Sequence, residues 1–277
     1  MSADMLMDYS IWIAAMVFAG IVGGFVAGLL GVGGGIVIVP ILYFVLDGMG
    51  VGDEIRMKIA VATSLASIVF TSLSSARSHY SRGAVDFSLL KSWGIPIFIG
   101  VIAGTVTAGL VSGMVLTTVF AVVALLVALN MLLRANSVAL TDGFPNGIVK
   151  AVSGFFVGLI SSMMGIGGGT LSVPILTAFG FDIRRAVGTA AAIGFIIAIP
   201  GTIGYAIAGW GANGLPASSV GYVNLIALVA LAPLTMLIAP LGAKMAHNIP
   251  RKVLSYAFAA FLFLTSARMF IDIWQHL

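Results

Sequence analysis

Residues 31–40 of the chain read GVGGGIVIVP, and residues 165–174 read GIGGGTLSVP. Both blocks are a glycine cluster followed by a short stretch that ends in valine and proline, and they align without gaps at an offset of 134 residues. Each block opens an apolar piece, 36–46 or 170–181, that covers about half of the hydrocarbon core at 1.5 Å per residue. We predict that each block begins a half-length helix.

The composition around the two blocks is that of a membrane protein. Of the 277 residues, 60% are apolar and 8% are charged, and the mean hydropathy is +1.17. A soluble domain has about 45–50% apolar and about 25% charged residues. So few charges cannot cover a water-exposed surface, and we predict an all-α polytopic membrane protein.

Thiol, metal and nucleic-acid chemistry are not indicated. The chain has no cysteine, and its three histidines are far apart in the sequence, so there is no disulfide framework and no metal-ligand motif. The net charge is +4, but the basic residues lie singly or in short clusters between apolar runs. We expect no cofactor, no metal and no nucleic-acid partner; the expected partners are the lipid bilayer and a small substrate.

Eight further apolar runs approach the length of about 20 residues that a spanning helix needs. They cover 11–30, 57–76, 92–111, 114–133, 149–164, 184–209, 219–242 and 253–275.

The matching blocks belong to a longer internal repeat. Residues 60–64 (AVATS) resemble residues 186–190 (AVGTA) at an offset of 126. We therefore divide the chain into a first repeat, 1–140, and a second repeat, 141–277. Each repeat crosses the membrane five times if its half-helix spans, or three times if its first helix and its half-helix together form a re-entrant hairpin. Because both counts are odd, the second repeat is predicted to be inverted relative to the first.

The charges of the loops agree with this inversion. The first-repeat loop 77–91 is basic, whereas its counterpart 209–218 in the second repeat has no charge. In the other pair, the second-repeat loop 243–252 is basic and its counterpart 110–113 has no charge. Cytoplasmic loops carry an excess of lysine and arginine. We predict that both termini lie on the non-cytoplasmic side of the inner membrane.

The glycine clusters are candidate anion sites. A helix that begins in glycine exposes unsatisfied N–H groups, and its dipole favours negative charge there. Hydroxyl groups nearby would add donors, and no ionisable side chain lies well inside a predicted span. The alternative is that the glycines only allow close helix packing, and that the hydroxyls bond to their own helices. The candidate substrate-binding residues are Gly33, Gly34, Gly35, Thr63, Ser64, Gly167, Gly168, Gly169, Thr170 and Thr189.

On these residues the chain resembles the sulfite exporter TauE/SafE family, also described as a toluene sulfonate uptake permease family. The resemblance rests on both glycine blocks, the two AVxT segments and residues 242–246 (GAKMA). It implies an inner-membrane protein that moves small sulfur-containing anions. The second block is preceded by Ser161-Ser162 where the first has Ala27-Gly28, which predicts that the two halves of the site are unequal.

The predicted function is transport of a small sulfur-containing anion by alternating access around a midplane site. An anion channel and a transporter of small carboxylates are the alternatives. An intramembrane enzyme is not expected, because no nucleophile with a base, carboxylate pair or metal-ligand cluster lies in the spans. The sequence leaves the anion, the direction of transport, the coupling ion and the oligomeric state open.

Overall fold

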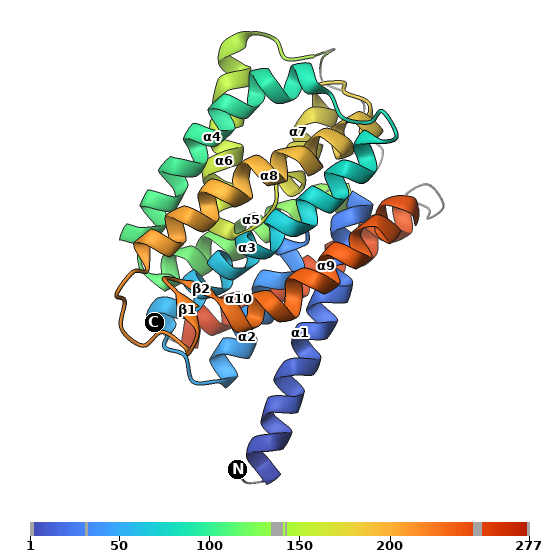
Figure 1. The fold of residues 1–277 in the computed structure, drawn as a ribbon. Helices are drawn as coiled ribbons and strands as arrows, with labels where there is room; N and C mark the ends of the chain where they lie inside the picture. Colours follow the sequence, from blue (N-terminus) through green and yellow to red (C-terminus); the bar gives the residue numbers. More distant parts are fainter. Residues whose placement is uncertain (1–2, 31–32, 134–140, 142, 246–250, 276–277) are drawn as a thin grey trace.

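The computed structural model describes residues 3–30, 33–133, 141, 143–245 and 251–275. The predicted residues Gly31 and Val32, the repeat boundary at residue 140, the loop 246–250 and the extreme ends of the chain lie outside the described residues. The fold is almost entirely helical (Figure 1). In chain order the elements are α1 (Ala3–Leu30), α2 (Gly35–Gly48), α3 (Asp53–Tyr80), α4 (Phe87–Leu110), α5 (Gly113–Leu133), α6 (Gly147–Met164), α7 (Gly169–Ala178), α8 (Ile183–Ala208), β1 (Ser219–Val220), β2 (Val223–Asn224), α9 (Leu225–Met245) and α10 (Arg251–Gln275).

The helix lengths confirm a multi-pass membrane protein. Among the described residues, seven helices are long and apolar enough to cross a bilayer: α1, α3, α4, α5, α6, α8 and α9. The helices α2 and α7 are apolar but shorter, with 14 and 10 residues, as the two glycine blocks predicted. With α10, which has 25 residues but is not one of these seven, the order of one long helix, one short helix and three long helices occurs twice.

Residues 219–224 differ from the prediction, which placed them at the start of a span. They form a two-stranded antiparallel hairpin, in which Val220 pairs with Val223. Ser218 and Gly221 have φ values of +60° and +54°, which a helix cannot accommodate. Asn224 then caps α9, because its side-chain oxygen accepts a hydrogen bond from the amide of Ala227 at 2.9 Å.

Glycines bring two pairs of long helices into close contact. The helix α1 packs along α9, and α4 packs along α6. A Cβ atom added to Gly28 of α1 would lie 1.8 Å from the carbonyl oxygen of Ala239, and one added to Gly158 of α6 would lie 2.0 Å from that of Ile97. Only glycine fits at such crossings, as is common between membrane helices.

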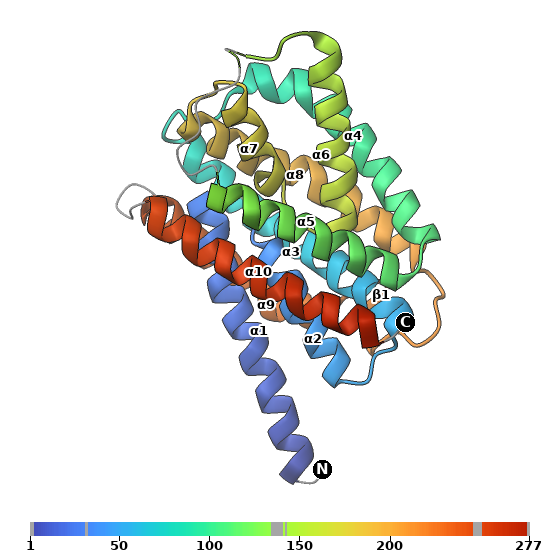
Figure 2. The same cartoon turned by 180° about the vertical axis from the view of Figure 1, so that it is seen from behind.

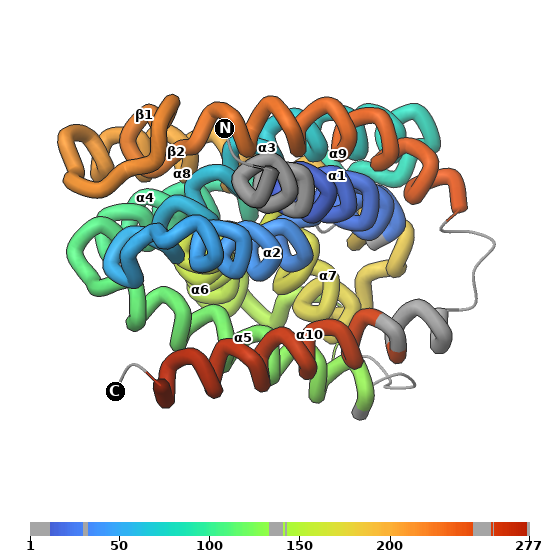
Figure 3. The backbone as a smooth tube through the Cα atoms, turned by 90° about the horizontal axis from the view of Figure 1, so that it is seen from below, coloured from blue at the N-terminus to red at the C-terminus, as the bar shows by residue number. Residues whose placement is uncertain are grey.

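The half-helices lie inside this frame. The long helices α3 and α8 pack on each other at the centre, and α10 lies along α5 on the rear face (Figure 2). Viewed from below, α2 and α7 lie between α9 on one side and the pair α5 and α10 on the other (Figure 3). The starts of α2 and α7 are thus enclosed by protein.

Parts of both terminal helices reach the same end of α2. A Cβ atom on Gly48 would lie 2.1 Å from the ring of Trp12 in α1, and Asp272 in α10 accepts a hydrogen bond from Tyr43. Which side of the membrane this end faces stays a prediction.

Candidate functional site

The two glycine clusters meet in the core of the protein. A Cβ atom on Gly33 would lie 3.1 Å from the Cα of Gly167, and one on Gly35 would lie 2.2 Å from the carbonyl oxygen of Gly165. The φ angles of Gly33, Gly34 and Gly165 are +75°, +79° and +65°, which side chains disfavour. The fold therefore brings both predicted halves of the site together, and it requires glycine for their contact.

Each cluster opens a helix without a side-chain cap. Gly34 is the N-cap residue of α2 and Gly168 that of α7, and neither position makes a side-chain cap hydrogen bond. The first N–H groups of a helix have no partner within it, and the helix dipole adds partial positive charge there. Two such ends in one enclosed region form a neutral, donor-rich environment suited to an anion.

Three of the predicted hydroxyl groups make hydrogen bonds between different segments of the core. Ser64 donates a hydrogen bond to the carbonyl oxygen of Gly165 at 2.7 Å, which fastens α3 to the second glycine cluster. The oxygen of Thr63 accepts from the amide of Asn224 at 3.0 Å, and that of Thr189 accepts from the amide of Asp86 at 2.9 Å. Contact of these hydroxyls with a substrate stays a prediction.

The partners of Thr63 and Thr189 were not anticipated from the sequence. Asp86 and Asn224 are the residues that cap α4 and α9. Each threonine therefore fixes the start of a helix that belongs to the other repeat. A capping residue before an apolar run is recognisable in sequence, but which buried hydroxyl it meets depends on tertiary packing.

Five buried hydroxyl groups have no hydrogen-bond partner among the described residues. Leaving such a group unsatisfied costs about 1–3 kcal/mol, so each calls for an explanation. Of these, Thr170 is a predicted site residue, Ser161 is one of the two serines that distinguish the second block from the first, and the other three were not predicted. The five residues are Ser72, Ser75, Ser161, Thr170 and Ser172, and none is more than 4% exposed.

Charged groups are buried at the far end of α2, away from its glycine cluster. Arg56 is 1% exposed; it pairs with Asp47 and Asp53 and lies 3.7 Å from a carboxylate oxygen of Asp272. Tyr43 donates a hydrogen bond to Asp272, and its ring lies beneath the Arg56 guanidinium at 4.5 Å. We call these five residues the ionic cluster. A cavity of about 20 Å³ beside it has room for one water molecule.

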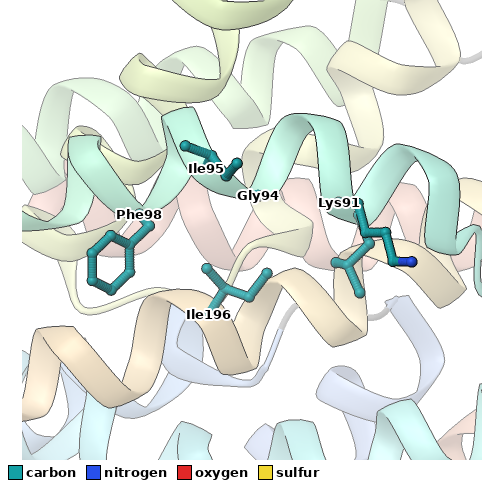
Figure 4. Close-up of a pocket in the computed structure, with 6 residues that line it drawn as sticks. Lys91, Gly94, Ile95, Phe98 and Ile196 are labelled. Atoms are coloured by element: carbon teal, nitrogen blue, oxygen red, sulfur yellow. The ribbon is translucent and has the colours of Figure 1, made fainter.

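A larger groove lies elsewhere and includes none of the predicted residues. Its volume is about 360 Å³, and Leu90, Lys91, Gly94, Ile95, Phe98 and Ile196 line it between α4 and α8 (Figure 4). Ile95 and Phe98 are 66% and 48% exposed. Such apolar exposure on a membrane-spanning helix is that of a lipid-facing surface, so we do not assign this groove to the substrate.

The family model for the sulfite exporter TauE/SafE matches residues 16–269, which include both glycine clusters, all of α2 to α9 and most of α10. The chain belongs to the TauE/SafE family. As a member it is a membrane transporter, which agrees with its multi-pass fold.

Three curated relatives are similar over 83% or more of their own length. A probable membrane transporter protein of Haemophilus influenzae is 31% identical over 260 residues, which cover 94% of this chain and 98% of the relative. The probable membrane transporter protein YunE of Bacillus subtilis is 27% identical, with coverage of 93% and 97%. A probable membrane transporter protein of Methanocaldococcus jannaschii is 26% identical, with coverage of 84% and 83%. No solved structure matches the chain.

Proposed function

We propose that this TauE/SafE transporter moves a small sulfur-containing anion, such as sulfite or an organosulfonate, by alternating access. The observation that carries the proposal is the meeting of two uncapped helix starts at Gly33–Gly35 and Gly167–Gly169, beside buried hydroxyls without partners. The first N–H groups of the two helices and the unpartnered hydroxyls can donate hydrogen bonds to a ligand. Such a site matches the oxygen atoms of an oxoanion, and the sulfur chemistry is suggested by the name of the family.

The helix pairs support the mechanism. If the second repeat matches the first, α6 corresponds to α1 and α9 corresponds to α4. The observed pairs α1 with α9 and α6 with α4 then exchange under a pseudo-two-fold axis, and so do the threonine contacts to the caps of α9 and α4. Inverted repeats related in this way allow one bundle to rock against the other around a central site.

Flux into proteoliposomes tests both the substrate and the mechanism. We expect protein-dependent uptake of labelled sulfite or a labelled sulfonate, and acceleration of that uptake when the vesicles are preloaded with unlabelled anion. Flux of a small carboxylate but of no sulfur anion would overturn the substrate class. Uptake without counterflow stimulation, together with single-channel currents, would show an anion channel instead.

Gly168→Ala is a suitable variant for this assay. Gly168 has an ordinary helical φ of −55°, and the added methyl group would lie 2.5 Å from the side chain of Ile193 and 3.1 Å from the amide nitrogen of Gly194. We expect reduced flux with the fold retained. The matching change at Gly34 is less informative, because its φ is +79° and a methyl group would lie 2.5 Å from the carbonyl oxygen of Gly23.

A further inference from the structure

The starts of α2 and α7 have unlike surroundings, although their glycine clusters match. At the repeat offset of 126, Ile68 of α3 corresponds to Gly194 of α8. Ile68 is fully buried, and its side chain lies 3.1 Å and 2.8 Å from the Cβ positions of Gly33 and Gly35. An apolar side chain therefore covers the start of α2.

Gly194 puts no side chain of its own at the equivalent position beside α7, where the neighbouring Ile193 packs 2.5 Å from the Cβ position of Gly168. A Cβ atom on Gly194 would lie 2.4 Å from the hydroxyl oxygen of Ser72 and 3.7 Å from the backbone nitrogen of Gly168. The Ser72 hydroxyl has no hydrogen-bond partner among the described residues. A free hydroxyl and the N-cap residue of α7 thus border the same small space.

The unpartnered hydroxyls also differ between the two repeats. At the repeat offsets, every one of the five stands opposite a residue that has no polar side chain. Thr170 and Ser172 correspond to Ile36 and Ile38, Ser72 to Ala198, Ser75 to Gly201, and Ser161 to Ala27.

We propose that the anion is held on one side of the centre, by the start of α7 with the hydroxyls of Ser72, Thr170 and Ser172. The start of α2, which Ile68 covers, contributes its helix dipole at the shared centre but no direct contact to the anion. This inference rests on the proposed function, because a bound oxoanion supplies the acceptors that these buried hydroxyls lack. It also explains why donors without partners are retained in a core where each costs stability.

The same side selects a singly charged oxoanion. No Asp, Glu, Lys, Arg or His occurs in α7, in α3 between Lys58 and Arg77, or in α8 after Arg185, so neutral dipoles alone replace the water around the anion. The Born cost of removing that water grows with the square of the charge, so a dianion loses about four times the solvation energy of a monoanion. Attraction to fixed dipoles grows only in proportion to the charge. Sulfonates and hydrogensulfite therefore bind, and sulfate is rejected.

The test compares the affinities of methanesulfonate and sulfate, two anions of similar size. They are measured by isothermal titration calorimetry on the full-length protein in detergent. We expect methanesulfonate to bind at least about tenfold more tightly than sulfate. Thr170→Val, Ser172→Ala and Ser72→Ala should each weaken methanesulfonate binding about tenfold or more, as expected for hydrogen bonds to a charged ligand.

Two matched variants serve as controls. Ile36→Val changes the α2 position that corresponds to Thr170, and Thr107→Val removes a hydroxyl that donates to the carbonyl oxygen of Ala103 in its own helix. Both should bind methanesulfonate like the unmodified protein, and melting curves of all variants verify the fold. Equal affinity for the two anions, or equal losses in Ile36→Val and Thr170→Val, would overturn the inference while leaving the proposed function intact. Binding of neither these anions nor sulfite would overturn both.

Discussion

The far ends of the two half-helices are closed by different chemistry. The end of α2 is held by the ionic cluster, in which Arg56 joins carboxylates from three segments. The end of α7 packs among aromatic rings. The ring centroid of Phe144 lies 4.6 Å from that of Phe179, 5.8 Å from that of Phe181 and 5.5 Å from that of Trp93. We call these four residues the aromatic cluster. Because the two helices match in backbone but not in the contacts at their ends, they should respond to different substitutions. The end of α2 should be sensitive to loss of charge, and the end of α7 to loss of side-chain volume.

The largest effect is expected for Arg56→Met. It removes the counter-charge of Asp272, whose side chain is 7% exposed, whereas Asp47 and Asp53 are about half exposed. Removing one partner of a buried ion pair costs about 3–5 kcal/mol. Unfolding in detergent measures the loss. Arg82→Met, at an exposed arginine that bonds only within its own turn, is the control; equal losses in the two variants would show that the ionic cluster contributes no specific stability.

Phe144→Ala breaks the aromatic cluster and should cost less, about 2–3 kcal/mol. The ring is half-buried, so it loses part of the roughly 3–5 kcal/mol of a fully buried phenylalanine. The loss should not change with salt concentration, since no ion pair is involved. Phe98→Ala, at a 48% exposed ring, is the matched control, and a comparable loss there would contradict the prediction.

Thr63→Val and Thr189→Val remove equivalent contacts in the two repeats, the hydrogen bonds from the amides of Asn224 and Asp86. Each leaves one capping amide without its acceptor, which costs about 1–2 kcal/mol. We expect similar losses in unfolding free energy for the two variants, and recovery in Thr63→Ser and Thr189→Ser. A fall in anion affinity with no loss of stability would instead favour the substrate contact predicted from the sequence.

The smallest effect is expected for Arg185→Ala. Arg185 is 59% exposed in its side chain and donates to Asp86 at 2.7 Å. Exposed pairs contribute about 0–1 kcal/mol and are screened by salt. The loss should therefore shrink as ionic strength rises in the unfolding assay. A loss as large as that of Arg56→Met would show that this end of the molecule also depends on charge.

Much of the candidate site was accessible from local pattern. The glycine blocks predicted where α2 and α7 begin, because a glycine cluster before a short apolar run has few other uses in a membrane protein. Thr170 was predicted because it directly follows its block, and Ser161 was noted because the first block has an alanine there. Ser72, Ser75 and Ser172 were not predicted, since a serine in a membrane helix usually bonds to its own helix and only the packing shows which ones do not.

The sequence by itself determined the membrane environment, the helices and the doubled order of elements, because hydropathy and helix length depend on composition along the chain. Tertiary structure decided what the repeated elements contact. It placed the glycine clusters against each other, paired Thr63 and Thr189 with helix caps, and set Ile68 beside α2 but the Ser72 hydroxyl beside Gly194 near α7. The glycine-cluster and threonine contacts join residues more than a hundred positions apart, and the Ile68 contact joins residues on different helices, so no local pattern encodes them.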